Sequence, residues 1–343
     1  MQTRAIKQIR LSLALLVITA LLIGAPALAA PRSAPQAAPA GRMAAAPVAA
    51  PLAAPVTFNL CAGTSTLTLA DSTSVPFWGF SNCSDTSPVI TLPGPTLIVN
   101  EGDVVTVNLS NQLGENVSIA FHGQGLTADT VGATPLGTTS YTFTASQAGT
   151  FLYEAGLTPN GAKQVAMGLH GALVVLPAAL PTTYTSEKVL VLSEIDPALN
   201  NAPASFNMLD YAPKYWLING ESHPDTDLIQ APAGSTLLVR YVNAGLTEHS
   251  MGLLGLDQTV IAKDGHARTA FRAVSETLAA GQTMDTLIEV PATVGARYPL
   301  YDTGRRLDNN GTANGGMMTF LEVGTAPPVV VTVLKPVAWR SPG

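Results

Sequence analysis

Short runs of alternating apolar and polar residues, separated by glycine, proline and asparagine, constrain the fold of this chain more than any other feature. Within residues 92–177 such runs occur at 96–99, 104–109, 140–143 and 172–176. Alternation with β-branched residues is typical of strands that bury one face, and turn residues about every ten positions favour a sandwich or barrel. The sequence therefore predicts an all-β fold.

A second set of strand-like runs follows a short proline-containing connection at residues 178–183, which is typical of a domain boundary. These runs lie at residues 188–193, 215–218, 235–242, 259–262 and 286–290. The run at 215–218 leads into Asn219-Gly220, a dipeptide that favours a tight turn. A length of 343 residues suits about two domains. We expect two tandem β domains at residues 56–177 and 184–323, followed by a C-terminal tail at 324–343.

The first 55 residues differ from the rest in composition. Three basic residues precede an apolar run at 11–23, and Ala27-Leu28-Ala29 offers small residues for cleavage, so residues 1–29 are predicted to be a signal peptide. An uncleaved N-terminal anchor is the alternative. Residues 30–55 are mostly alanine and proline, a composition typical of a disordered, extended linker. We expect an exported protein that is secreted, periplasmic or held at the cell surface.

The charge balance narrows the range of partners. Without the three basic residues of the predicted signal peptide, 14 basic and 23 acidic residues remain, a balance of −9. Basic residues do not cluster in the sequence, so we expect no nucleic acid partner. The expected partner is an unidentified protein or surface.

Both halves of the chain carry motifs of one family. The first half contains PGPT at 93–96, EGD at 101–103, FHG at 121–123, AGTFLY at 148–153 and QVAMGLHGALVVLP at 164–177. The second contains LSEIDP at 192–197, WLING at 216–220, HSMGLLG at 249–255, VIAKDG at 260–265 and LAAGQTMDTLIEVP at 278–291. The first half resembles the first cupredoxin (plastocyanin-like) domain of multicopper oxidases and, less closely, that of copper nitrite reductases. The second half resembles the middle domain of three-domain oxidases. The resemblance implies two cupredoxin-like Greek-key β-sandwiches.

Most of the copper ligands that this resemblance implies are missing from the sequence. Where the oxidases have His-x-His, this chain has Ala120 and His122. Where they have Tyr-His-Ser-His, it has Tyr153-Glu154-Ala155-Gly156, and a nitrite reductase pattern would place His-Cys on Glu154-Ala155. A complete oxidase site takes ten histidines and a cysteine, whereas the chain has five histidines. A complete set of copper sites therefore cannot be built from this chain.

Two histidines stand at positions where the family has copper ligands. His122 corresponds to the second histidine of the lost pair, and His249 to the first histidine of a His-Pro-x-His-x-His motif. Together with Glu154, two imidazoles and a carboxylate could hold copper or zinc. The alternative is that both histidines only form local hydrogen bonds. Of the others, we expect His170 to be packed in the interior, and His223 and His266 to lie in loops.

Cys61 and Cys83 are the only cysteines of the chain. An even number of cysteines in an exported protein favours a disulfide, which is our prediction. A copper thiolate is the alternative, although neither cysteine has a neighbouring histidine and both precede the strands where the family carries its ligand cysteine.

Two classes of function are consistent with the sequence. The first is a copper-free, non-catalytic binding or structural protein, which we favour, with no cofactor and with self-association through the cupredoxin faces as an option. The second is a copper-dependent oxidoreductase of the multicopper oxidase or nitrite reductase type, or a copper-binding protein with a reduced site. The sequence contains no Gly-x-Ser-x-Gly motif, P-loop or His-Glu-x-x-His motif that would indicate a different catalytic chemistry.

Overall fold

The structure is a computed structural model that describes residues 55–85, 88–179 and 183–325. The predicted signal peptide, nearly all of the predicted linker and nearly all of the predicted tail lie outside these residues. In the part of the chain that is described, no helix has the length and apolar character that a membrane crossing requires. The predicted all-β fold is confirmed: strands dominate, and only two short α-helices and one 3-10 turn accompany them in the described ranges.

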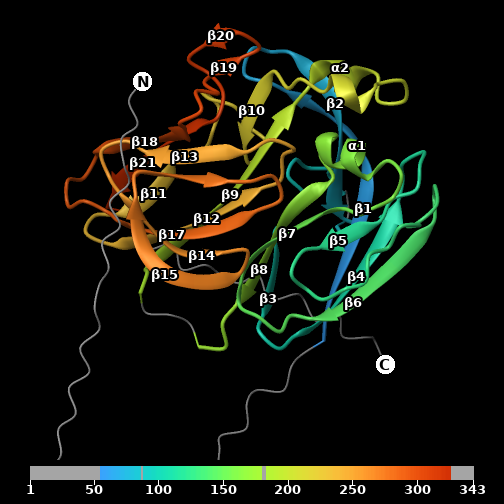
Figure 1. Cartoon of the computed structure of the whole chain (residues 1–343), viewed down its shortest axis with the longest axis horizontal. Coiled ribbons are helices and arrows are strands. Elements are labelled where there is room, and N and C mark those ends of the chain that lie inside the picture. The colour runs from blue at the N-terminus through green and yellow to red at the C-terminus, as the bar shows by residue number, and fades with distance from the viewer. Residues whose placement is uncertain (1–54, 86–87, 180–182, 326–343) are drawn as a thin grey trace, which may run out of the picture. The chain divides into compact units, whose positions relative to one another are not determined.

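The first half of the chain forms a sandwich of two four-stranded sheets (Figure 1). The first sheet has the order β2-β1-β4-β6, from β1 (Pro55–Thr68), β2 (Ser74–Asn82), β4 (Val104–Asn111) and β6 (Thr138–Thr144). The second has the order β3-β8-β7-β5, from β3 (Leu97–Asn100), β5 (Ile119–Phe121), β7 (Gly149–Ala155) and β8 (His170–Leu176). Helix α1 (Gly161–Ala166) connects β7 to β8. The pairs β1–β4 and β3–β8 are parallel and the others antiparallel, so the chain crosses between the sheets.

The second half repeats this plan with larger sheets. A six-stranded sheet has the order β10-β9-β12-β17-β14-β15, from β9 (Ser186–Ile195), β10 (Tyr215–Ile218), β12 (Thr236–Asn243), β14 (Gln258–Lys263), β15 (His266–Ala273) and β17 (Thr283–Glu289). A five-stranded sheet has the order β11-β21-β18-β13-β16, from β11 (Ile229–Pro232), β13 (His249–Leu253), β16 (Ser275–Leu278), β18 (Arg297–Asp302) and β21 (Met318–Gly324).

Three small elements complete the second half. Helix α2 (Pro197–Asn201) and the 3-10 turn η1 (Met208–Asp210) lie between β9 and β10, and β19 (Asp308–Asn309) pairs with β20 (Thr312–Ala313). In each sheet, the strand that comes first in the sequence again pairs in parallel with a later strand: β9 with β12, and β11 with β21. Both halves therefore share one topology.

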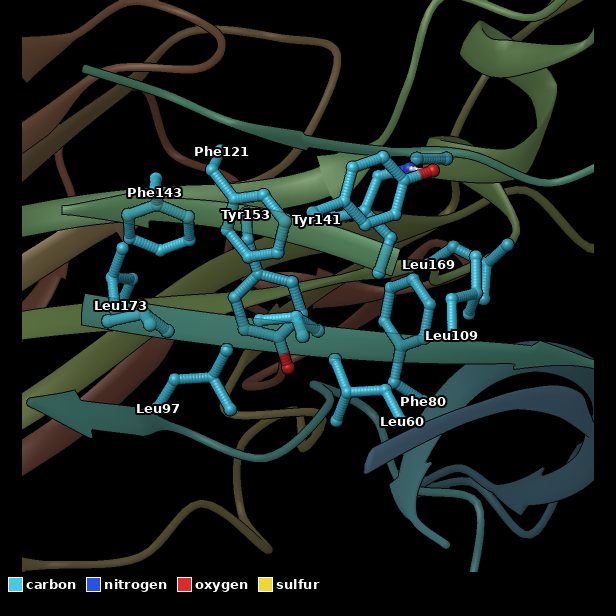
Figure 2. Close-up of a cluster of buried hydrophobic side chains, with 14 of the residues drawn as sticks. Leu60, Phe80, Leu97, Leu109, Phe121, Tyr141, Phe143, Tyr153, Leu169 and Leu173 are labelled. Atoms are coloured by element: carbon cyan, nitrogen blue, oxygen red, sulfur yellow. Dashed lines mark hydrogen bonds between the residues drawn. The ribbon is translucent and has the colours of Figure 1, made fainter. Parts of the chain in front are cut away.

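The core of the first sandwich follows from the alternation in the sequence. In β4 every second residue is buried, which places Val105, Val107 and Leu109 inside. Aromatic rings fill the centre: the Phe121 ring lies 5.1 Å from that of Phe143, and Tyr153 is fully buried (Figure 2). Burial of each such side chain stabilises the fold by roughly 1.5–3 kcal/mol. The Tyr153 hydroxyl donates to the Pro95 carbonyl at 2.7 Å, so no polar atom of this ring is left unpaired.

The predicted disulfide between Cys61 and Cys83 is confirmed, with a Cα–Cα distance of 5.3 Å. It links β1 to the segment that follows β2. In the chain-entropy model, closing a loop with a sequence separation of 22 residues stabilises the folded state by roughly 3 kcal/mol.

The turn predicted at Asn219-Gly220 follows β10 and helps to join the two sandwiches. Both residues have positive φ, 52° and 84°, as a type I′ turn requires. A Cβ at Gly220 would overlap the Leu92 carbonyl of the first sandwich, so only glycine allows this close approach.

A buried ionic network also joins the sandwiches. Arg240 on β12 pairs with Asp285 at 3.2 Å and with Glu187 at 2.9 Å, and all three side chains are less than a tenth exposed. From the first sandwich, the Thr150 hydroxyl donates to Asp285 at 2.6 Å and accepts from Arg240 at 3.0 Å. Because every charge in this network is paired, its burial is tolerated.

Candidate functional site

His122 and Glu154 form a pair at the edge of the second sheet of the first sandwich. The register of β5 and β7 sets Ala120 opposite Glu154, and His122 follows directly after β5. The His122 backbone N–H donates to the Leu152 carbonyl at 3.0 Å, which fixes its position beside β7. The His122 Nε2 then lies 2.9 Å from the Glu154 Oε1. The structure thus brings together two of the three predicted metal-site residues.

This pair is accessible from solvent. The side chain of His122 is 41% exposed and that of Glu154 is 19% exposed. The hydrogen bond to the Glu154 carboxylate raises the pKa of His122, against the lowering effect of partial burial, and the charge of Asp264 adds to the increase. A partly exposed pair of this kind contributes little to stability. The hydrogen bond between the two side chains can therefore be replaced by bonds to a ligand.

Two hollows of about 400 Å³ each meet at His122. One lies between His122, Phe151 and Leu152 of the first sandwich and Asp264, His266 and residues 279–283 of the second. The other is bounded by Glu154, residues 155–158 and part of α1 on one side, and by Gly245, Leu246, Ala280 and Gly281 on the other. The pair therefore stands at the seam between the two sandwiches, where both contribute walls.

His249 lies in a different, closed environment. Its Nδ1 is 2.9 Å from Asp302 and its Nε2 is 3.4 Å from Glu194, and all three side chains are fully buried. Arg306 donates to Asp302 at 3.0 Å. Burial alone would lower the pKa of His249, but the hydrogen bonds and charges of Asp302 and Glu194 outweigh it and raise the pKa. The result is a buried ionic cluster in which His249 balances two carboxylates.

This cluster reaches the wall of the second hollow through Glu194. Its Oε1 accepts hydrogen bonds from the backbone N–H groups of Leu246 and Thr247 at 2.7 and 3.1 Å. A Cβ at Gly245 would overlap the Glu194 carboxylate, so the loop requires glycine there. The buried cluster therefore positions the segment that faces Glu154 across the hollow.

The three predicted metal-site residues thus fall into two places. The structure brings His122 and Glu154 together, whereas both ring nitrogens of His249 are engaged by Asp302 and Glu194. Within the described ranges no group of three or more histidine, cysteine, aspartate or glutamate side chains is arranged to hold a metal ion. The protein itself offers at most the imidazole and the carboxylate of the His122–Glu154 pair at this edge.

The remaining histidines are placed largely as expected. His170 is packed in the interior, where burial lowers its pKa and its Nδ1 approaches the Val165 carbonyl at 3.3 Å. His223 lies in the segment between β10 and β11. His266, expected in a loop, instead begins β15, with its Nδ1 3.0 Å from the Gln147 side chain of the first sandwich.

The residues present do not fit the complete copper centres of the resemblance. A blue-copper site requires a cysteine thiolate, and both cysteines are joined in the disulfide. The methyl group of Ala120 faces Glu154 where the resemblance implies an imidazole. A single copper ion fits in part, because an imidazole nitrogen and a carboxylate oxygen are both donors that copper accepts.

Sequence reasoning missed Asp264 and His266 as walls of the first hollow, and Glu194 and Asp302 as partners of His249. The Asp264-Gly265 dipeptide, which favours a tight turn, was a usable signal for the first pair. In the structure both residues have positive φ, and Gly265 lies close to Gly149 and Phe151 of the first sandwich. Glu194 and Asp302 gave no signal, because they lie 55 and 53 positions from His249 in the sequence.

Two successive β-sandwiches, each with parallel and antiparallel strand pairs, define a protein of the cupredoxin class. Family models described as multicopper oxidase match residues 89–179 and residues 186–323. The chain belongs to the multicopper oxidase family.

Known proteins agree with this assignment. Laccase-2 of rice is 31% identical over 60% of this chain and 41% of its own length, and copper resistance protein A of Escherichia coli is 25% identical over 66% and 46%. The chain thus spans less than half the length of these relatives. The crystal structure of blue copper oxidase from Nitrosomonas europaea superimposes with a TM-score of 0.70 at 24% identity, over 78% of this chain and 85% of that one. This likeness shows the cupredoxin fold.

These comparisons correct one prediction. We expected a protein without a cofactor, with copper only as an alternative. The family models are those of copper oxidases, and the matched proteins include ones that are named for copper. Copper is therefore the cofactor to expect in this family, and the prediction of none is wrong. The error came from taking the number of lost ligands as a sign that no copper is bound.

Proposed function

We propose that this chain is an exported copper-binding member of the multicopper oxidase family that holds copper at a reduced site formed by His122 and Glu154. It acts by binding rather than as a self-sufficient oxidase. The observation that carries the proposal is the 2.9 Å pair of His122 and Glu154, partly exposed where two hollows meet. It lies on the strands where the resemblance implies copper ligands.

The chemistry of the pair suits one ion. The His122 Nε2 and the Glu154 Oε1 already point at each other, so an ion bound between them would replace their hydrogen bond. Copper accepts both imidazole and carboxylate donors. Glu154 lies on β7, which pairs with β5 on one side and with β8 on the other, so its backbone is held in position before a ligand arrives. Bound copper supplies one-electron redox chemistry, which a binding role does not use.

A calorimetric titration of the full chain with Cu(II) tests this proposal. We expect one site per chain, with affinity at least tenfold weaker in His122→Ala and reduced in Glu154→Gln. His223→Ala is the matched control, because it removes another partly exposed histidine away from the seam, and it should bind copper as the unaltered chain does. Unchanged copper affinity in His122→Ala would show that the site lies elsewhere.

A copper-dependent oxidoreductase is the second candidate. It is supported by the relatives, which include proteins named laccase and multicopper oxidase. The small number of histidines argues against it, since one chain lacks the donors for a complete oxidase centre. Oxygen uptake by the copper-loaded protein, with ferrocyanide as the electron donor, separates the two. Turnover that requires copper and is lost in His122→Ala would favour the oxidoreductase.

Export remains part of the proposal. It is supported by the signal pattern at residues 1–29 and by the disulfide, which persists in oxidising compartments. The domain boundaries at 56–177 and 184–323, an unidentified protein or surface partner, and self-association through the cupredoxin faces likewise stay predictions. The mass of the protein recovered outside the cytoplasm would test export, because removal of residues 1–29 changes the mass by a known amount.

A further inference from the structure

The last strand of the six-stranded sheet, β15, has an open edge over its full length. It pairs with β14 on one side, where the register shifts so that residues 268–270 lie opposite Ile261 alone, and among the described residues no strand pairs with its other side. Of its eight residues, seven are exposed and Ala273 is half-buried. Unlike an ordinary edge strand, which buries one face, β15 exposes the side chains of both faces. It ends beside Val274, itself 61% exposed.

Other sheet edges in the described part of the molecule are less suited to pairing with an added strand. Five of them, β3, β5, β10, β11 and β16, have only three or four residues. The longer edge β2 contains Pro76, whose carbonyl accepts from Asn200 of α2. The edge β6 buries Tyr141 and Phe143 on one face. Short strands, proline, charged side chains and bulges all disfavour unselective pairing at an edge. β15 carries charge and a register shift, which also disfavour unselective pairing, but it differs from the other edges because both of its faces are exposed.

The two faces of β15 differ in chemistry. Successive side chains of a strand point to opposite faces, so His266, Arg268, Ala270 and Arg272 share one face, and Ala267, Thr269, Phe271 and Ala273 share the other. Arg272 pairs with Asp257, whereas Arg268 has no ion-pair partner among the described residues. Phe271 is 43% exposed. One face thus carries all the basic side chains of the strand and the other is uncharged, in a chain whose balance of charge is acidic.

The turn before β15 is anchored, so the strand is held in place. The Gln147 side chain of the first sandwich donates to the Gly265 carbonyl at 2.5 Å and contacts His266 at 3.0 Å. A Cβ at Gly265 would overlap the Phe151 ring, which shows how closely the turn packs on the first sandwich. An edge fixed at one end and paired along β14 needs little ordering before a partner adds a strand.

We propose that β15 is a docking edge for an extended acidic peptide segment of a partner protein, which adds to the sheet as an antiparallel or parallel strand. Backbone hydrogen bonds would supply affinity, as in other cases of strand addition. Acidic residues at alternate positions would face Arg268 and Arg272, and apolar residues between them would cover Phe271. Charge complementarity selects this partner over a second copy of the chain. A symmetric antiparallel pair centred on Ala270 would set Arg268 opposite Arg272, and like charges in that position are unfavourable.

Fluorescence anisotropy with a labelled eight-residue peptide tests the proposal on the full chain. The peptide alternates glutamate with valine or threonine, and a control peptide of the same composition has its glutamates contiguous. We expect saturable binding of the alternating peptide and at least tenfold weaker binding of the control. The double variant Arg268→Glu/Arg272→Glu should weaken binding at least tenfold. Arg305→Glu, which reverses one exposed charge elsewhere, should change it less than twofold.

A proline scan separates strand addition from simple charge attraction. The pairing with β14 shifts register opposite residues 268–270, so Thr269→Pro and Ala270→Pro each remove a donor where that pairing is already interrupted. The variant that keeps the unfolding midpoint should bind the alternating peptide at least tenfold more weakly. If neither variant keeps it, the charge reversal decides the test.

Several results would overturn the proposal. These are absence of saturable binding, equal binding of both peptides, or unchanged binding in the folded proline variant. Self-association of the unliganded chain that the proline abolishes would assign the edge to a second copy. Equal competition by a sulfated polysaccharide would assign the basic face to polyanions in general.

Discussion

The two sandwiches each carry a histidine–carboxylate pair on corresponding strands, and the two pairs differ in burial. In the first sandwich, His122 and Glu154 lie on the β5–β7 edge and are partly exposed. In the second, His249 and Asp302 lie on the corresponding strands β13 and β18 and are fully buried. A histidine–carboxylate pair is therefore available to a ligand in the first sandwich and stabilises the fold in the second.

Burial decides which role each pair takes. An exposed ion pair gains little from Coulomb attraction, and water can replace either partner. A buried pair cannot be opened without leaving a charge uncompensated in a medium of low dielectric constant. His122 is thus available to a ligand, whereas His249 cannot leave Asp302 and Glu194 without destabilising the second sandwich.

The largest expected effect comes from His249→Leu. The change leaves the Glu194 and Asp302 carboxylates buried with only Arg306 to balance them. We expect a loss of about 3–5 kcal/mol in the free energy of unfolding, measured by urea denaturation. A loss below about 1 kcal/mol would show that the buried cluster is not ionic.

A smaller effect is expected from Gly245→Ala. The added methyl group would overlap the Glu194 carboxylate and push the loop that faces Glu154. We expect a loss of about 1–3 kcal/mol by urea denaturation, together with altered copper affinity. Gly114→Ala is the matched control, because its Cβ would meet no neighbouring atom and its φ is not positive.

The pH dependence of stability isolates His249. Its pKa is raised above 6.5 in the folded state, so the folded protein holds this proton more tightly than the unfolded chain. The stabilisation is full below the unfolded pKa and is lost as the pH rises through the folded pKa. The difference in unfolding free energy between the unaltered chain and His249→Gln should therefore shrink as the pH is raised. A difference independent of pH would contradict this.

The smallest effect on stability is expected from His122→Ala. Because this side chain is 41% exposed, its loss should change the free energy of unfolding by less than about 0.5 kcal/mol. The variant should nevertheless lose most of its copper affinity, measured by calorimetry. A stability loss comparable with that of His249→Leu would remove the distinction between the two pairs.

The sequence predicted the fold well because local patterns encode it. Alternation in β4 set Val105 and Val107 inside, and the Asn219-Gly220 turn formed as its residue types favour. The disulfide followed from the number of cysteines and the expected compartment. These features depend on neighbours in the sequence or on composition alone.

The candidate site was only half predictable. Resemblance pointed to His122 and Glu154, and strand register brought them together although they are 32 positions apart. It also pointed to His249, but the side chains that engage His249 come from β9 and β18. No local pattern reveals which distant carboxylates meet a buried histidine, so its burial could be learned only from the tertiary structure.

The open edge of β15 was likewise hidden from the sequence. Its sequence mixes basic and apolar residues without a strict alternation, since Arg268-Thr269 and Ala270-Phe271 interrupt it. Only the order of the sheet places this strand at the end with both faces exposed. The exposure therefore depends on what the rest of the chain leaves uncovered.

The copper content per chain, measured by mass spectrometry after loading with Cu(II) and removal of free metal, tests the central claim most directly. The account predicts close to one copper ion per chain, lost in His122→Ala and retained in His223→Ala. Three or more copper ions per chain, or copper that survives His122→Ala, would contradict a reduced site at the His122–Glu154 pair.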